Sequence, residues 1–238
     1  EVYMKLIKMM SLSLFATGLI HTAQAADILV ESFETDGSTL TGDGRYVSTS
    51  EFNDGSNDHW SRTDGNIPPV ANISGAYSGF DGNIFWAAED VNDNGGNGLN
   101  PQTIAINNIN IVGFQNLVLS GLFGAGNERD LGGSNYDESD FITVQYEIDG
   151  GGLTNGLCFN YEPGSTDSNP VSNEPFGFDA DCNGQSEGPA FRLGTVLQEF
   201  SFNIPETGTT MNLLISVAMD SGSEEVAFDN IKLTGDPI

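Results

Sequence analysis

The feature that most constrains the fold is the recurrence of apolar residues at every second position over long stretches of the chain. Residues 142–148 place Ile, Val, Tyr and Ile at every second position, and residues 211–219 do the same with Met, Leu, Ile, Val and Met. A period of two predicts β-strands with one buried face and one exposed face. No stretch after residue 25 has the period of an amphipathic helix.

Shorter apolar runs separated by turn residues add further strands. The candidates are residues 27–34, 45–50, 84–89, 103–112, 116–123, 156–161, 200–204 and 225–234. Glycine makes up 30 of the 238 residues and lies mostly between these runs, as it does in antiparallel hairpins. We therefore expect an all-β protein, a two-sheet antiparallel β-sandwich of the jelly-roll type, with residues 26–238 forming a single domain.

The first 25 residues have the pattern of a secretory signal peptide. Lys5 and Lys8 precede an apolar stretch over residues 9–20, and Ala23-Gln24-Ala25 then offers small residues where a signal peptidase cuts. We expect cleavage after residue 25, with residues 1–3 as upstream read-through; a hydrophobic first helix is the alternative. No other apolar run reaches the roughly 18 residues of a membrane span. The sequence thus predicts a secreted protein, extracellular or periplasmic.

The charge of the chain limits its partners. Seven Lys and Arg residues against 34 Asp and Glu residues give a formal net charge of −27. A surface this acidic repels phosphate backbones, so we expect no nucleic-acid partner. It attracts divalent cations, although adaptation to salty water would explain the same excess. The acidic segments 89–96 and 127–140 are expected to be solvated loop charges.

Two cysteines are present, Cys158 and Cys182. In a secreted protein an even pair predicts a disulfide, and this one would close a loop rich in Pro, Gly, Asn and Asp. Two free buried thiols are the alternative. No Cys-x-x-Cys motif occurs, which argues against redox chemistry and against a zinc ribbon.

Strand candidates at opposite ends of the chain, residues 29–34 and 226–233, carry carboxylates among apolar residues. A lone buried carboxylate is costly unless it is paired or coordinates a metal. We therefore expect the first and last strands to meet around a cation.

A second candidate cation site lies at residues 179–187. Oxygen ligands stand at alternate positions, Asp179, Asp181 and Asn183, and a glycine follows. This spacing resembles the first half of an EF-hand loop, in which the chain wraps a calcium ion. The closing glutamate of that motif is missing, and Glu187 would have to replace it. The alternative is an Asx-rich turn held by the disulfide.

Three short motifs carry a family resemblance: Glu31-Ser32-Phe33-Glu34, Asp58-His59-Trp60 and Phe228-Asp229-Asn230-Ile231. Together they resemble the framework of MAM-like and lectin-like (concanavalin-type) jelly-roll modules of secreted bacterial proteins, and the chain is similar to modules found beside extracellular nuclease or lamin-tail domains. The resemblance implies a cation near Glu34, Asp58 and Asp229. The four-cysteine pattern of MAM domains and a nuclease module are both missing, so neither cell adhesion nor nuclease activity is carried over.

Aromatic residues suggest a ligand surface. Trp60, Trp86 and Tyr46 could stack on the apolar faces of sugar rings, and burial in the core is the alternative. Catalytic motifs are weak, because His59 is the only histidine after residue 25 and no serine lies in a G-x-S-x-G elbow.

The sequence therefore predicts a calcium-stabilised, non-catalytic module that binds extracellular polysaccharide or matrix. The alternative is a self-associating structural subunit of a filament, coat or biofilm matrix. A third possibility is a glycan-cleaving enzyme that uses two distant carboxylates.

Overall fold

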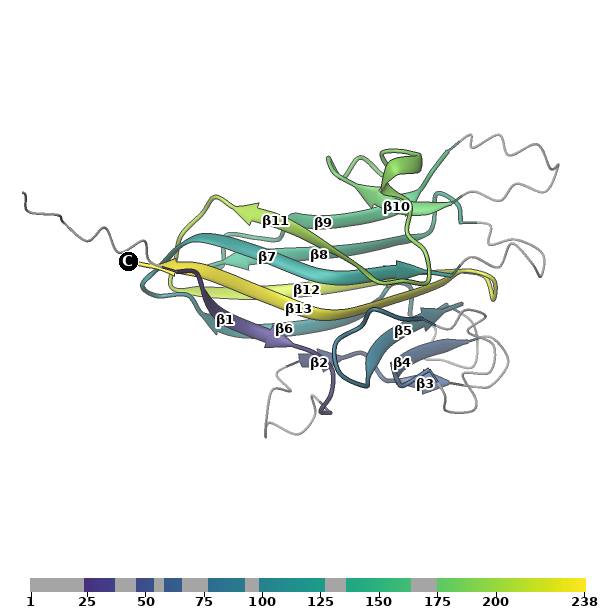
Figure 1. The fold of residues 1–238 in the computed structure, drawn as a ribbon, viewed down its shortest axis with the longest axis horizontal. Helices are drawn as coiled ribbons and strands as arrows, with labels where there is room; N and C mark the ends of the chain where they lie inside the picture. Colours follow the sequence, from purple (N-terminus) through teal and green to yellow (C-terminus); the bar gives the residue numbers. More distant parts are fainter. Residues whose placement is uncertain are drawn as a thin grey trace, which may run out of the picture.

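The computed structural model describes residues 24–36, 46–53, 58–65, 77–92, 99–126, 136–163 and 175–238, so the expected signal peptide lies almost entirely outside the described residues. Two antiparallel sheets pack face to face, with the strand axes of one sheet nearly aligned with those of the other (Figure 1). One short 3₁₀ turn (η1, Pro189–Phe191) interrupts the described strands. The expected all-β, two-sheet antiparallel sandwich is confirmed. No described helix is long and apolar enough to cross a bilayer.

The first sheet has seven strands in the order β11-β7-β13-β5-β4-β3, and β1 also pairs with β13. Its strands are β1 (Ala26–Glu31), β3 (Phe52–Asn53), β4 (His59–Thr63), β5 (Phe85–Glu89), β7 (Phe114–Ala125), β11 (Gln198–Ile204) and β13 (Glu225–Pro237). The second sheet has six strands in the order β10-β9-β8-β12-β6-β2. Its strands are β2 (Tyr46–Ser48), β6 (Gln102–Asn110), β8 (Phe141–Ile148), β9 (Thr154–Tyr161), β10 (Phe176–Asp179) and β12 (Thr210–Ala218).

The last strand, β13, lies in the middle of the first sheet. One edge pairs with β7. On the other edge, β1 pairs with residues 231–235 and β5 pairs with residues 225–228. The first and last strands therefore meet, as the sequence predicted. The ladder breaks at Asp229 and Asn230, where the register with β7 shifts and Asn230 has φ 51°.

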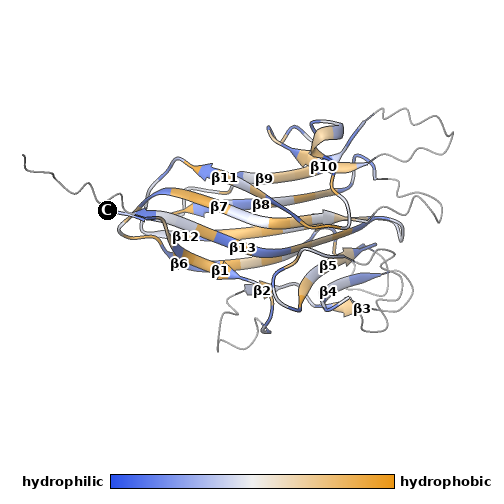
Figure 2. Cartoon of the chain, in the orientation of Figure 1, coloured by the Kyte–Doolittle hydropathy of each residue, from blue (hydrophilic) through white to orange (hydrophobic). Residues whose placement is uncertain are grey.

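The core lies between the two sheets and follows the predicted alternation. On β8, Ile142, Val144 and Tyr146 are buried, and the residues between them are partly exposed. Met211, Leu213 and Ile215 of β12 do the same. Figure 2 shows apolar and polar residues interleaved along the strands. The outward-facing positions of β8 and β12 form the surface on which the candidate site lies.

Strand β5 departs from this pattern, because all five of its residues are buried. One side packs into the main core, and the other side packs under a second small cluster that contains Tyr77, Leu197 and Ala227. The segment around Tyr77 is bonded to the segment around Leu197, since the Leu197 N–H donates to the Ser78 carbonyl at 2.8 Å. These two connections cover what would otherwise be the exposed face of β5.

Candidate functional site

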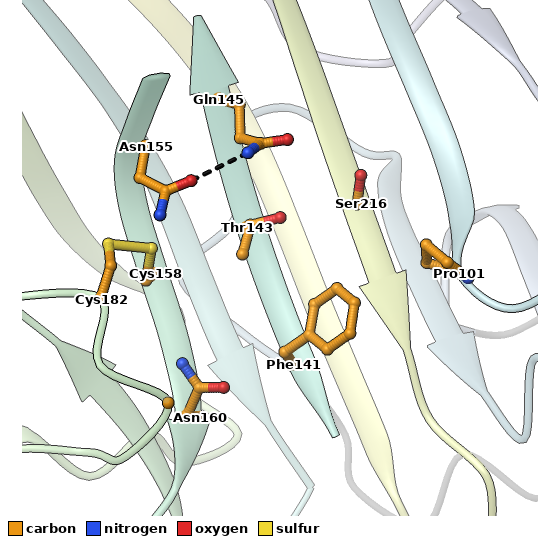
Figure 3. Close-up of a pocket in the computed structure, with 10 residues that line it drawn as sticks. Pro101, Phe141, Thr143, Gln145, Asn155, Cys158, Asn160, Cys182 and Ser216 are labelled. Carbon is orange, nitrogen blue, oxygen red and sulfur yellow. Dashed lines mark hydrogen bonds between the residues drawn. A yellow bond between two sulfur atoms is a disulfide. The ribbon is translucent and has the colours of Figure 1, made fainter. Parts of the chain in front are cut away.

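A hollow of about 420 Å³ lies on the outer face of the six-stranded sheet (Figure 3). Its floor consists of the outward-facing residues of β8, β9 and β12, which alternate with the core residues described above. Its lining residues are Pro101, Phe141, Thr143, Gln145, Asn155, Cys158, Asn160, Cys182, Gly184 and Ser216. None of these side chains is charged.

The strand register places the polar lining residues in rows across the sheet. Ser216 of β12 lies opposite Thr143 of β8, and Gln145 of β8 lies opposite Asn155 of β9. Within that last pair, Gln145 Nε2 donates to Asn155 Oδ1 at 2.8 Å, which orients both amides. Figure 3 shows these side chains standing side by side on the strands. The hollow thus presents amides and hydroxyls in fixed positions.

One aromatic side chain, Phe141, stands at the end of the hollow and lies opposite Asn160 across the β8–β9 pair. The amide of Asn160 is oriented from behind, because its Nδ2 donates to Asp179 Oδ2 at 2.9 Å. A phenyl face next to amides and hydroxyls can contact the apolar face of a sugar ring while its hydroxyl groups are hydrogen-bonded.

The disulfide forms one wall of the hollow. Cys158 of β9 is bonded to Cys182 with a Cα–Cα distance of 5.4 Å, so the predicted disulfide is confirmed. The Cys158 side chain is on the outer face of β9, because its neighbours Leu157 and Phe159 belong to the core. The bridge therefore holds the loop after β10 against the sheet beside the hollow.

That loop is the predicted calcium segment, and its carboxylates do come together. One oxygen each from Asp179, Asp181 and Glu187 lies within 4.8 Å of the others. The buried Asp179 carboxylate, however, already accepts hydrogen bonds from Asn160 Nδ2 and from the backbone N–H groups of Asn183 and Gly184.

Asn183 is also engaged, since its Oδ1 accepts the Gln185 N–H at 3.0 Å. This is the geometry of an Asx turn, which the sequence left open as the alternative. Acidic side chains that could bind a metal ion are therefore present in this loop, and Asp179 is satisfied by protein donors.

Glu34 and Asp229 meet at the turn before β5. Glu34 Oε1 accepts hydrogen bonds from the N–H groups of Asn83 and Ile84 at 2.6 and 2.8 Å, and Asp229 Oδ2 accepts that of Asp81 at 2.6 Å. Asp229 Oδ1 is buried and has no hydrogen-bond partner. Burial, together with the nearby charges of Asp81 and Glu34, raises the pKa of Asp229 to about 7.

Asp58 does not join this pair. It precedes β4, and the register places its neighbour His59 opposite Glu89 at the far end of β5. The turn that holds Glu34 lies before the first residue of β5, so the five residues of that strand, roughly 17 Å, separate the two places. The expected trio of Glu34, Asp58 and Asp229 is therefore corrected to a pair.

The expected aromatic platform is also corrected. Trp60 and Trp86 are 0% exposed and Tyr46 is 2% exposed. They pack against one another and against Phe33 and Phe228, with the two tryptophan rings 4.9 Å apart. These aromatics hold the sandwich together, and no face of them is available to a sugar.

Sequence reasoning missed the residues that line the hollow. Thr143 and Gln145 occupy the polar positions of the β8 alternation, which the sequence identifies only as the exposed side of a strand. Asn155, Asn160 and Ser216 join them only once the order of β9, β8 and β12 is known. The signal that could have indicated them is a strand whose exposed positions hold neutral amides and hydroxyls in a chain otherwise rich in carboxylates.

No protein-family model matches the chain, and no curated protein matches it. Solved structures do resemble it distantly. A cleaved adhesin domain of Lys-gingipain from Porphyromonas gingivalis is 15% identical with a TM-score of 0.41, over 89% of this chain and 99% of that one. The CBM22-1 xylan-binding domain of Paenibacillus barcinonensis Xyn10C is 10% identical with a TM-score of 0.40, over 90% of this chain and 97% of that one.

A third solved structure, TmCBM61 in complex with β-1,4-galactotriose, is 8% identical with a TM-score of 0.35, over 79% of this chain and 100% of that one. Likenesses this distant say nothing about what the present chain binds. Its function has to be inferred from its own site.

Proposed function

We propose that this chain is a non-catalytic binding module for a neutral extracellular polysaccharide, and that the hollow on the six-stranded sheet is its binding site. The observation that carries the proposal is the lining of the hollow. Amides and hydroxyls of Thr143, Gln145, Asn155, Asn160 and Ser216 surround the hollow, and the Phe141 ring stands at its end.

The charge of the protein favours a neutral ligand over an acidic one. The lining side chains carry no charge, whereas the whole chain has a formal net charge of −27. A polymer of uronic acids would approach this surface against the repulsion of like charges. Uncharged sugar hydroxyls meet no such repulsion and can both donate to and accept from side-chain amides.

The same lining argues for binding without catalysis. Hydrolysis of a glycosidic bond uses a pair of carboxyl groups that flank the bond. No aspartate or glutamate is among the described residues that line the hollow. The proposed role is therefore to hold a glycan in place.

Two further parts of the proposal concern stability and location. Calcium would stabilise the fold at the Glu34–Asp229 pair, since the unpartnered oxygen of Asp229 is the kind of hard ligand that this ion prefers. The second proposed calcium site is the loop that contains Asp179, Asp181, Asn183 and Glu187.

An extracellular location is supported by the disulfide, because such bonds persist in oxidising compartments.

Affinity electrophoresis tests the binding proposal. Migration of the protein is compared in gels that contain neutral hexose or pentose polymers and in gels that contain uronate polymers. We expect a neutral polymer to retard the protein. Phe141→Ala and Gln145→Ala should each weaken retardation by roughly 3- to 10-fold, the value of one lost stacking contact or hydrogen bond.

Gln198→Ala is the matched control, because Gln198 is an exposed amide on β11 of the other sheet. This variant should migrate like the unchanged protein. Binding at the hollow is refuted if no neutral polymer retards the protein, or if Gln145→Ala and Gln198→Ala behave alike. Light scattering on the same samples would detect the alternative role as a self-associating structural subunit.

A further inference from the structure

A second group of carboxylates lies at the end of the sandwich, where two connections meet. Asp137 and Asp140 immediately precede β8, and Asp220 and Glu224 belong to the turn between β12 and β13. The register brings the two connections together, because Phe141 at the start of β8 lies opposite Ala218 at the end of β12. The two pairs come from parts of the chain about 80 residues apart, as the contact between Ser139 and Asp220 demonstrates.

Hydrogen bonds within the group fix the positions of these carboxylates. Asp140 Oδ2 accepts the Asp137 N–H at 2.7 Å, and Glu224 Oε2 accepts the Asp220 N–H at 3.1 Å. The Ser139 hydroxyl lies between Asp137 Oδ1 and Asp220 Oδ2, at 2.5 and 2.8 Å. One oxygen each from Asp137, Asp140 and Asp220 lies within 4.8 Å of the others.

Two of the four carboxylates are buried. Asp140 is one of them, although residues 127–140 were expected to be solvated loop charges, and Asp137 is exposed as expected. Asp140 is 0% exposed and Glu224 is 2% exposed. Asp140 Oδ1 is buried and accepts no hydrogen bond from a described N–H group, and the Glu224 carboxyl lies beside this side chain. Arg62 and Arg192 form their ion pairs away from this group, with Asp36, Glu51 and Glu162.

A cation would stabilise this arrangement. Asp140 and Glu224 each accept one backbone N–H, but two buried carboxylates side by side still repel each other unless a proton or a metal ion lies between them. Burial raises the pKa of both Asp140 and Glu224. The negative charge of Asp140 raises the pKa of Glu224 further. The contrast with Asp179 is direct, because that buried carboxylate accepts three hydrogen bonds from protein donors.

We propose that Asp137, Asp140, Asp220 and Glu224 bind a calcium ion that ties the segment before β8 to the β12–β13 turn. Calcium takes six to eight oxygen ligands at about 2.3–2.6 Å, so oxygens on opposite sides of one ion lie about 5 Å apart. The 4.8 Å limit on the three aspartate oxygens matches that span. The site is independent of the Glu34–Asp229 pair, which lies at the other end of β5.

Calcium titration of the full chain by isothermal calorimetry, with chelated protein as the starting point, tests this site. The variants are Asp220→Asn, whose side chain is exposed, and Asp140→Asn, whose side chain is buried. Asp229→Asn and Asp181→Asn are the controls, because each alters one of the other two candidate sites. We expect Asp220→Asn to weaken one binding event at least tenfold while Asp229→Asn and Asp181→Asn leave that event unchanged.

Thermal melting adds a readout that a purely structural cluster would not produce. In chelator, Asp140→Asn should melt higher than the unchanged protein, because the amide removes one of two adjacent buried carboxylates. When calcium is added, the melting temperature of Asp140→Asn should rise by less than that of the unchanged protein. The site is refuted if the unchanged protein binds no calcium, or if Asp220→Asn and the unchanged protein bind it with the same stoichiometry and affinity. Neither readout uses a glycan, so the outcome is separate from that of the binding proposal.

Discussion

His59 at the start of β4 is a buried histidine whose contacts favour the neutral ring. Asn53 Nδ2 lies 2.8 Å from His59 Nδ1, and an amide N–H can only donate, so Nδ1 accepts. The proton is then on Nε2, which lies 3.3 Å from the Ser61 carbonyl oxygen. Burial lowers the pKa of His59 to about 4, against a smaller opposing effect of the Ser61 carbonyl.

This low pKa predicts a loss of stability in mild acid. The unfolded chain takes up the proton near pH 6.5, whereas the folded chain does not until about pH 4, so stability falls as pH falls through that window. The full difference is about 3 kcal/mol. We expect the free energy of unfolding of His59→Gln, measured by urea denaturation, to lack this loss.

The comparison is made as a difference between the two proteins at each pH. Asp140, Glu224 and Asp229 have raised pKa values and change stability in the opposite direction, and their contribution cancels in the difference. A difference that stays constant from pH 7 to pH 4 would show that His59 is not the group responsible.

Gly82 makes the turn that joins Glu34 to Asp229 possible. Its φ is +73°, and a Cβ there would run into the Glu34 carboxylate. We expect Gly82→Ala to lower the free energy of unfolding by about 1–3 kcal/mol from backbone strain alone, with a further loss from the displaced carboxylate. Chemical denaturation measures this.

Gly150→Ala is the matched control, because Gly150 has φ +75° and nothing within 4 Å of its added Cβ. It carries the strain without the clash. Equal losses in the two alanine variants would show that the clash with Glu34 adds nothing to the backbone strain. The position of Glu34 beside Asp229 would then not contribute to stability.

At the scale of elements, β9 and the loop after β10 act together through the disulfide. The bridge spans a sequence separation of 24 and holds one wall of the hollow. The same loop is also attached through Asp179, which accepts hydrogen bonds from Asn160 and from two backbone N–H groups. These bonds place Asn160 at the hollow, so the loop contributes to the site as well as to stability.

Replacement of both cysteines by serine should therefore have two effects. Loop-closure entropy predicts a loss of roughly 3 kcal/mol in the free energy of unfolding. We also expect retardation by the polysaccharide to weaken, because the wall loses its covalent anchor. Chemical denaturation measures the first effect, and affinity electrophoresis measures the second.

Arg192→Met is the control for general loosening of the loop. It breaks the Arg192–Glu162 ion pair, whose N–O distance is 2.9 Å, on the other side of the loop. Equal loss of binding in both variants would contradict a specific role for the disulfide.

At the scale of the whole molecule, the sequence predicted the sandwich because alternation is a local property. Strand β8 follows it strictly and β12 follows it over Met211, Leu213 and Ile215, and the carboxylates in the first and last strands indicated that these strands meet. The sequence left the burial of Trp60 and Trp86 open as an alternative, because it depends on β4 and β5 lying side by side with both rings in the core between the sheets.

Long-range proximity was the other missing information. Asp140 and Glu224 belong to connections that only the β8–β12 pairing brings together. Asn155 and Ser216 join Gln145 for the same reason. A linear motif such as residues 179–187 was visible in the sequence, and its carboxylates do converge. The neutral lining of the hollow has no linear motif, which is why the sequence directed attention to the aromatics instead.

The central claim is that the outer face of the six-stranded sheet binds a neutral glycan. Titration of isotope-labelled protein with a neutral oligosaccharide from the retarding polymer, followed by NMR of the side-chain amides, tests it most directly. We expect shifts of the Gln145, Asn155 and Asn160 side-chain amides, with Gln198 unchanged. Shifts confined to the seven-stranded sheet, or no shift at saturating oligosaccharide, would contradict it.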